Sequence, residues 1–150
     1  MALNTLRWEC LPFEQLNNTQ LYKIIQLREK VFVVEQNCPY LDTDDKDFQA
    51  KHLMAWNNNQ LVAYARLLPP GISYKDASIG RFVTAISVRR SGVGKMLMQK
   101  CLEQMQVDFP GQSIRISAQE YLRDFYGSFG FAKQGEAYLE DGIPHVEMLR

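Results

Sequence analysis

The chain has 150 residues, of which 46% are hydrophobic and 23% charged, and its formal net charge is zero. These values are typical of one soluble globular domain, 1–150, and they exclude a global field that recruits nucleic acid or an anionic membrane. No apolar run approaches the roughly 20 residues that span a bilayer, and the first residues lack a signal-peptide core. The three cysteines are odd in number and show no paired metal spacing, which favours a reducing cytoplasm.

The chain is predicted to begin with a strand and a helix. Residues 6–10 are typical of a short strand, which Pro12 ends. Asn18 or Thr19 is predicted to cap the helix, which should end near Val33–Val34. Its apolar face is predicted to contain Leu21, Ile24, Ile25, the stem of Arg28, Val31 and Phe32.

An acidic run, Asp42–Asp47, follows this helix. It matches a Ca²⁺ loop poorly, because Lys46 and Asp47 stand where a ligand and a glycine are needed. We expect a solvated loop, with attraction of a cationic amine as the alternative.

The middle of the chain alternates strands with one long helix. Residues 52–56 and 61–68 are predicted to form a hairpin, because the asparagines between them tolerate a left-handed turn. Residues 78–84 are rich in β-branched and aromatic side chains and predict a third strand. The helix that follows is predicted from apolar residues at steps of three and four, namely Val93, Met96, Leu97, Cys101 and Met105.

The last third is predicted to contain a strand over 113–118, a short helix from Tyr121 to Tyr126, and strands over 131–138 and 145–149. Asp141-Gly142 indicates a turn between the last two strands, and Pro144 predicts an edge or a bulge at the start of the final one. This order implies an α+β (mixed α/β) fold, in which a mixed sheet is covered by helices.

The segment Arg89–Lys95 lies where a strand turns into a helix. Unpaired backbone N–H groups, the positive end of the helix dipole and three basic side chains make this a good site for a phosphate. It is not a P-loop, because Arg89 replaces the first glycine and Met96 replaces the Mg²⁺-binding hydroxyl. It is not a dinucleotide fingerprint either, because Leu97 replaces the third glycine. A glycine-rich turn that merely caps a helix is the remaining alternative.

Two motifs resemble those of the GNAT superfamily of N-acetyltransferases. Arg89-x-x-Gly92-x-Gly94 resembles the family's acyl-CoA pyrophosphate loop, and Gln119 to Phe131 resembles its second signature, although Gln119 replaces the usual Asn. Nearly the whole chain, from about Trp8 to Met148, resembles the ElaA-like group. The segments that carry this narrower likeness are 27–28, 31–40, 63–67, 79–81 and 141–145.

The resemblance implies a GNAT acyl-CoA N-acyltransferase fold with a mostly antiparallel sheet, and acetyl-CoA as co-substrate without a metal. It also implies direct transfer to an amine, with Tyr126 protonating the leaving thiolate. The residues that we expect to bind the cofactor are Phe82, Val83, Thr84, Arg89, Arg90, Ser91, Gly92, Val93, Gly94, Lys95, Gln119, Phe125 and Tyr126.

An amine must lose a proton before it attacks, and Glu35 and His145 are the candidate general bases, directly or through a water. His52 is expected to have a packing role. A cysteine nucleophile is the opposing hypothesis, but Cys10, Cys38 and Cys101 lack an identifiable activating partner, so we expect them to be structural.

Three functions therefore compete. The first is an acetyltransferase acting on a small or peptide amine, the second an acyl-CoA sensor without turnover, and the third an interaction domain without CoA. Exposed strand edges at the C-terminus favour a homodimer.

Overall fold

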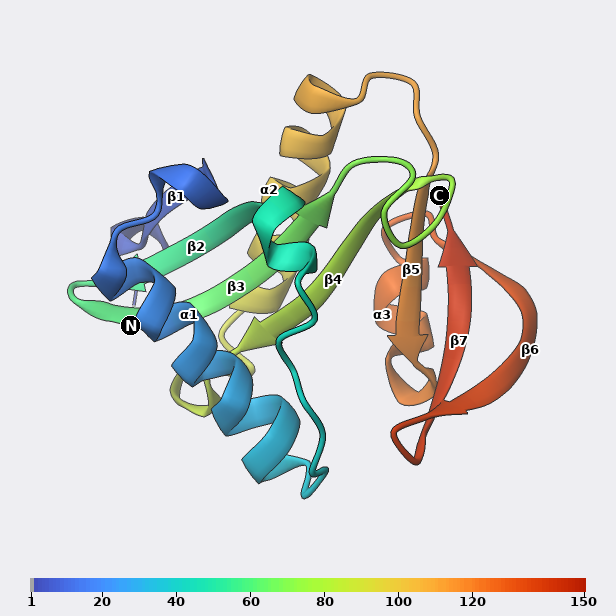
Figure 1. The fold of residues 1–150 in the computed structure, drawn as a ribbon, viewed down its shortest axis with the longest axis horizontal. Coiled ribbons are helices and arrows are strands. Elements are labelled where there is room, and N and C mark those ends of the chain that lie inside the picture. Colours follow the sequence, from blue (N-terminus) through green and yellow to red (C-terminus); the bar gives the residue numbers. More distant parts are fainter. Residues whose placement is uncertain (1) are drawn as a thin grey trace.

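The computed structural model describes residues 2–150, which form one seven-stranded sheet with helices on both faces (Figure 1). The strand order is β1-β2-β3-β4-β5-β7-β6, and all neighbours are antiparallel except the β4–β5 pair. The strands are β1 (Arg7–Pro12), β2 (Lys51–Asn57), β3 (Gln60–Leu68), β4 (Ala77–Thr84), β5 (Ile114–Gln119), β6 (Ala132–Glu140) and β7 (Ile143–Leu149). The helices are α1 (Asn18–Arg28), α2 (Val93–Asp108) and α3 (Arg123–Gly127). The predicted mixed, mostly antiparallel α+β fold is confirmed.

Helix α1 begins one residue earlier than predicted. The Asn17 side chain accepts from the Gln20 backbone N–H, and the Gln20 side chain accepts from the Asn17 N–H, which makes a capping box. Neither Asn18 nor Thr19 is the cap. After Arg28 the helix widens into a π-helical segment, Glu29–Glu35, which ends close to the predicted position.

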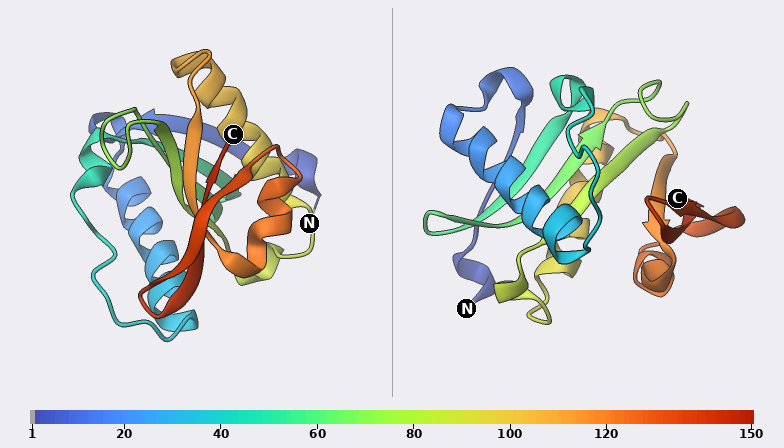
Figure 2. Two further views of the ribbon diagram at one scale, coloured as in Figure 1. Left: turned by 90° about the vertical axis from the view of Figure 1, so that its right-hand side faces the viewer. Right: turned by 60° about the horizontal axis from the view of Figure 1, so that its bottom comes forward.

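The core has two halves, one on each face of the sheet. Helix α1 and the π-helical segment pack on one face, where Ile24, Leu27 and Val31 contact Met54 and Tyr64. Helices α2 and α3 cover the other face, as Figures 1 and 2 show. The buried side of α2 consists of Val93, Leu97, Met98, Cys101 and Met105, so Met98 takes the place predicted for Met96. Successive side chains of a strand point to opposite faces of the sheet, so each half of the core receives a different set of residues.

Strands β4 and β5 separate soon after they meet. Within residues 2–150 their paired positions are only Ala77 with Ile114 and Ser78 with Arg115. Further along β4, Arg81 and Phe82 together oppose the single residue Ala65 of β3, and Arg81 has a left-handed φ of 47°. This bulge adds local twist to β4. The two strands are unpaired from beyond Ser78, before this bulge, and Figure 1 shows their separate paths.

The expectation of a solvated acidic loop is wrong. Asp42 and Asp47 are buried, and they hold the guanidinium of Arg28, which is itself 1% exposed. Arg28 Nε lies 2.6 Å from Asp42 Oδ2, and Arg28 Nη1 lies 2.8 Å from Asp47 Oδ1. Arg66 of β3 bonds the same Asp47 oxygen at 3.1 Å and Asp44 at 2.7 Å.

The arginines also set the protonation of this segment. Burial raises the pKa of the Asp44 carboxyl, but the hydrogen bond and charge of Arg66, together with Arg81, outweigh it and lower the pKa to about 2. An unfolded Asp titrates near 3.8. The stability that comes from ionised Asp44 is therefore complete above that value and is lost as the pH falls through about 2.

The C-terminal strands differ from the prediction in one respect. Strand β7 is internal, between β5 and β6, and β6 is the outer strand with all its residues exposed. Pro144 precedes His145, the first β7 residue that pairs with β5. Its missing N–H therefore interrupts no β5–β7 pairing, which explains why an internal strand tolerates it. The Asp141-Gly142 turn is confirmed, with φ values of 51° and 77°.

Asp47→Asn should destabilise the protein by about 3–5 kcal/mol, because two buried guanidinium groups lose a shared counter-charge. Urea unfolding at pH 7 measures the change. Asp45→Asn is the matched control, since Asp45 is exposed and Asn tolerates its φ of 66°. The control should change stability by less than about 0.5 kcal/mol. Equal effects of the two substitutions would contradict a structural role of the Asp47 ion pairs.

Candidate active site

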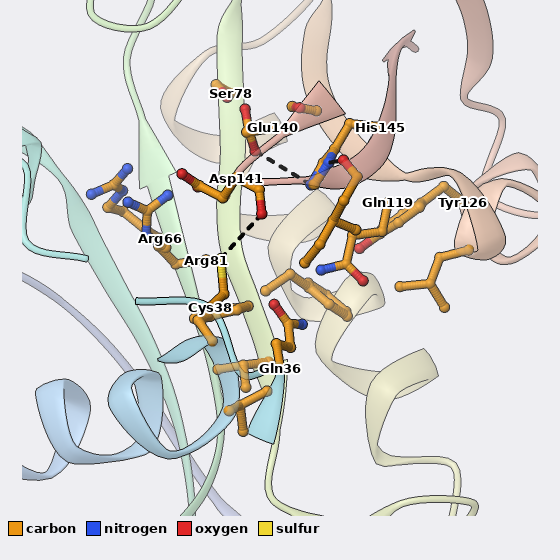
Figure 3. Close-up of a pocket in the computed structure, with 18 of the residues that line it drawn as sticks. Gln36, Cys38, Arg66, Ser78, Arg81, Gln119, Tyr126, Glu140, Asp141 and His145 are labelled. Carbon is orange, nitrogen blue, oxygen red and sulfur yellow. Dashed lines mark hydrogen bonds and ion pairs between the residues drawn. The ribbon is translucent and has the colours of Figure 1, made fainter. Parts of the chain in front are cut away.

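A cleft of about 470 Å³ lies between the diverging ends of β4 and β5. One wall comes from β4, the opposite wall from β5 and α3, and the segment after the π-helix and the β6–β7 turn lie around it. Figure 3 shows Arg81, Gln119, Tyr126 and His145 around this space. Side chains from parts of the chain that are far apart in the sequence therefore meet in one place.

The predicted cofactor residues converge at one end of the cleft. A Cβ built on Gly94 would lie 3.9 Å from Thr84 Cγ2 and 4.0 Å from Phe125 Cζ, so α2, β4 and α3 meet there. A Cβ at these distances would make ordinary van der Waals contacts, and because Gly94 has none, the space between Thr84 and Phe125 stays free. The predicted residues that line the cleft here are Phe82, Val83, Thr84, Arg89, Gly94, Gln119, Phe125 and Tyr126.

The other residues of the predicted phosphate loop lie at the start of α2, outside the cleft lining. Gly92 is the N-cap with a φ of 92°, and no side chain caps the helix, which leaves its first N–H groups for an anion. Arg90 and Lys95 are exposed, whereas Ser91 donates its hydroxyl to the Val88 carbonyl. The Val93 side chain is buried in the core, so this residue offers a ligand only its backbone.

Tyr126 lies in α3 among aromatic rings. Its ring centroid is 5.2 Å from that of Phe125, 6.0 Å from Phe82 and 6.3 Å from Phe131. The side chain lines the cleft although the residue is 7% exposed. Burial raises the pKa of the phenol well above its usual range. The phenol of Tyr126 therefore stays protonated at neutral pH.

His145 lines the cleft from β7, where it pairs with Gln119 of β5. Its Nδ1 lies 2.7 Å from the Ile143 carbonyl oxygen. A carbonyl only accepts, so Nδ1 carries a hydrogen and Nε2 is the atom that gains or loses a proton. Nε2 lies 3.3 Å from Glu140 Oε2, a contact that Figure 3 marks. Glu140 is thus the counter-charge for a protonated His145.

Glu35 also lines the cleft, at the end of the π-helical segment. Its Oε2 accepts a hydrogen bond from Arg89 Nη1 at 2.7 Å. Arg89 also donates to the Thr84 carbonyl oxygen, from Nη2 at 3.2 Å. The structure therefore pairs a predicted base with a predicted phosphate ligand.

Comparison with known proteins agrees with this geometry. The family model described as an acetyltransferase (GNAT) domain matches residues 31–150. The chain is 43% identical over 147 residues to Protein ElaA of Escherichia coli (strain K12), and the match covers 97% of this chain and 96% of that protein. The chain belongs to the ElaA-like group of GNAT acetyltransferases.

Solved structures show the same relationship. An acyl-CoA N-acyltransferase from Pseudomonas aeruginosa is 41% identical with a TM-score of 0.93, over 97% of this chain and 99% of the other. Escherichia coli ElaA itself is 43% identical with a TM-score of 0.90, over 96% of this chain and 99% of the other. An aminoglycoside 6′-N-acetyltransferase complexed with coenzyme A is only 16% identical with a TM-score of 0.69, over 95% and 96% of the two chains, and shows the fold alone.

Several lining residues of this GNAT cleft were not predicted as site residues. Arg66, Arg81 and Asp44 line it from the ion-pair cluster, and Asp141 from the β6–β7 turn. The Cys38 thiol donates to the Asp141 carbonyl oxygen at 3.2 Å, so two distant loops touch beside the cleft (Figure 3). The Asp141-Gly142 turn was a usable signal in the sequence, whereas nothing local marked the arginines, because their partners are far along the chain.

The cysteines fit a structural role. Burial raises the pKa of the Cys10 thiol to about 11 and that of Cys101 well above its usual value, so both stay protonated. Cys38 is buried, and its thiol donates to the Asp141 carbonyl oxygen.

No group of three or more metal-ligating side chains occurs within residues 2–150, and no helix in that range is long and apolar enough to cross a membrane.

Proposed function

We propose that this GNAT protein is an N-acetyltransferase that moves the acetyl group of acetyl-CoA directly to an amine in a ternary complex. The observation that carries the proposal is the convergence of an uncapped α2 N-terminus, the free end of β4 and the buried phenol of Tyr126 on one cleft. The likeness to an acyl-CoA N-acyltransferase at 41% identity supports the choice of thioester.

The cofactor's pyrophosphate binds the N–H groups at the start of α2, with Arg89, Arg90 and Lys95 supplying positive charge. The pantetheine arm follows Phe82–Thr84, where β4 has no β5 neighbour. A backbone N–H of this segment stabilises the oxyanion that forms when the amine attacks. The proposed pantetheine and pyrophosphate contacts thus follow one another along the chain, from Phe82 to Lys95.

The chemical step forms the C–N bond and breaks the C–S bond. His145 Nε2 takes a proton from the amine, and Glu140 stabilises the imidazolium that results. Glu35 is the second candidate for this role, once it has left Arg89. Tyr126 gives its proton to the leaving thiolate, so that CoA leaves as the free thiol. No acyl-enzyme forms, in agreement with the protonated states of Cys10 and Cys101.

A protein that only senses acyl-CoA is the alternative function. It requires the phosphate loop and the end of β4, but not Tyr126 or His145. The position of both groups in the same cleft favours catalysis over sensing.

Three free cysteines, two of them buried, suit a reducing compartment, and we place the protein in the cytoplasm.

Calorimetric titration with acetyl-CoA tests the cofactor site. The intact protein should bind, and the Arg89→Ala, Gly94→Trp double variant should lose binding, because an indole at Gly94 fills the space beside Thr84 and Phe125. Arg123→Ala, which removes an exposed charge from α3, is the control and should bind normally. A failure of the intact protein to bind would overturn the enzyme and the sensor together.

Tyr126→Phe should lower kcat by about a hundredfold, the lower range for loss of one acid–base group, and leave the KM for acetyl-CoA unchanged. Release of CoA thiol during turnover measures both constants. Tyr121→Phe removes a phenol that is 77% exposed from the same cleft and is the matched control. Equal kcat values for Tyr126→Phe and wild type would remove Tyr126 from the acid role.

The pH dependence of kcat/KM tests the base. His145→Gln should slow turnover and change the profile, because a carboxamide cannot take the proton of the amine. Glu35→Gln is measured beside it as the variant of the second candidate. Profiles of both variants that match wild type would exclude both residues as the base.

A further inference from the structure

Arg89 makes two contacts inside the cleft, and both concern the proposed reaction. Its Nη1 donates to Glu35 Oε2 at 2.7 Å, although the two residues are 54 positions apart. Its Nε and Nη2 lie 3.4 and 3.2 Å from the carbonyl oxygen of Thr84, the last residue of β4. The side chains of Arg89 and Glu35 are 36% and 32% exposed, so the pair is open to solvent and able to separate.

These contacts conflict with a bound cofactor. The Thr84 carbonyl belongs to the β4 end along which the pantetheine arm is proposed to lie, and the guanidinium covers it. The same guanidinium is proposed to bind pyrophosphate, which is a stronger and bidentate partner for Arg than one exposed carboxylate. When Arg89 turns its guanidinium fork to the phosphates, it gives up Glu35 and Thr84.

We propose that Arg89 exchanges Glu35 for the cofactor's pyrophosphate, and that the released Glu35 carboxylate then receives a positively charged amine as acceptor. The inference rests on the proposed function and adds the order in which the two substrates bind. Acyl-CoA binds first, because the carboxylate that recognises the acceptor is neutralised by Arg89 until then. By linkage, a bound cationic acceptor strengthens cofactor binding by the same factor.

The surroundings of Glu35 favour a cation once Arg89 has left. Glu35 ends the helical stretch that begins at Asn18, and the negative end of a helix dipole adds to the charge of its carboxylate. Two other carboxylates of the cleft are paired with residues outside the proposed cofactor site. Asp44 is held by Arg66 and Arg81, and Glu140 contacts His145. Glu35 is thus the carboxylate whose partner changes when the cofactor binds.

Binding of CoA alone tests the exchange without any acceptor or turnover. Glu35→Gln should tighten the Kd for CoA about two- to fivefold in calorimetry, because Arg89 no longer has to leave a carboxylate whose pairing has the strength of an exposed ion pair. Asp141→Asn is the matched control. It removes a carboxylate from the same cleft, and Asn tolerates its φ of 51°. The control should leave the Kd unchanged.

A double-variant cycle separates the exchange from a general loss of negative charge. Arg89→Ala should weaken CoA binding, and Glu35→Gln added to Arg89→Ala should then have no effect. An unchanged or weaker Kd in Glu35→Gln would overturn the inference, as would tightening that persists without Arg89. Failure of the intact protein to bind CoA would instead overturn the proposed function, on which this inference rests.

Discussion

The carboxylate of Asp47 is shared by two buried guanidinium groups, Arg28 of α1 and Arg66 of β3, and the cleft depends on this contact. Buried ions of this kind persist only when each has a close opposite charge and further hydrogen bonds. His52 supplies one more bond, from its Nε2 to the Asp47 carbonyl oxygen, and burial lowers its pKa so that it stays neutral. The irregular segment between α1 and β2 is thereby fixed to the sheet, and its neighbours Cys38, Tyr40 and Asp44 line the cleft.

The same cluster reaches β4, the strand along which we propose that the cofactor binds. Arg81, in the bulge of β4, donates from Nη2 to the Asp42 carbonyl oxygen at 2.9 Å, and its Nε lies 2.9 Å from Asp42 Oδ1 without hydrogen-bond alignment. A left-handed backbone at a residue with a long side chain is costly, and it persists where the surroundings over-determine it. Strand β4 has no β5 partner beyond Ser78, and the ion pairs of Arg81 hold the bulge that follows. The acidic segment and the cofactor site therefore belong to one structural unit.

Elements that depend on local signals were predictable from the sequence. The apolar period placed α2, Gly92 and Gly94 marked its N-terminus, and the Asp-Gly pair marked the last turn. The acidic segment was not predictable in this way, because its partners lie 14 to 39 residues away, and composition alone describes six polar residues as solvated. The contact between Glu35 and Arg89 spans 54 residues and was not predictable for the same reason. Residue type indicates candidate members of the site, whereas tertiary pairing decides which of their charges are already engaged.

The ion pairs around the cleft are of two kinds, buried and exposed. Around Asp47 the charges are buried and hold one another, so they position the walls and take no part in exchange. At Arg89 and Glu35 the charges are about one-third exposed and each has a second role. An exposed ion pair has little net stability, so an anionic ligand easily replaces the carboxylate. The buried ion pairs thus hold the architecture, and the exposed one lies where we propose that the cofactor and the acceptor meet.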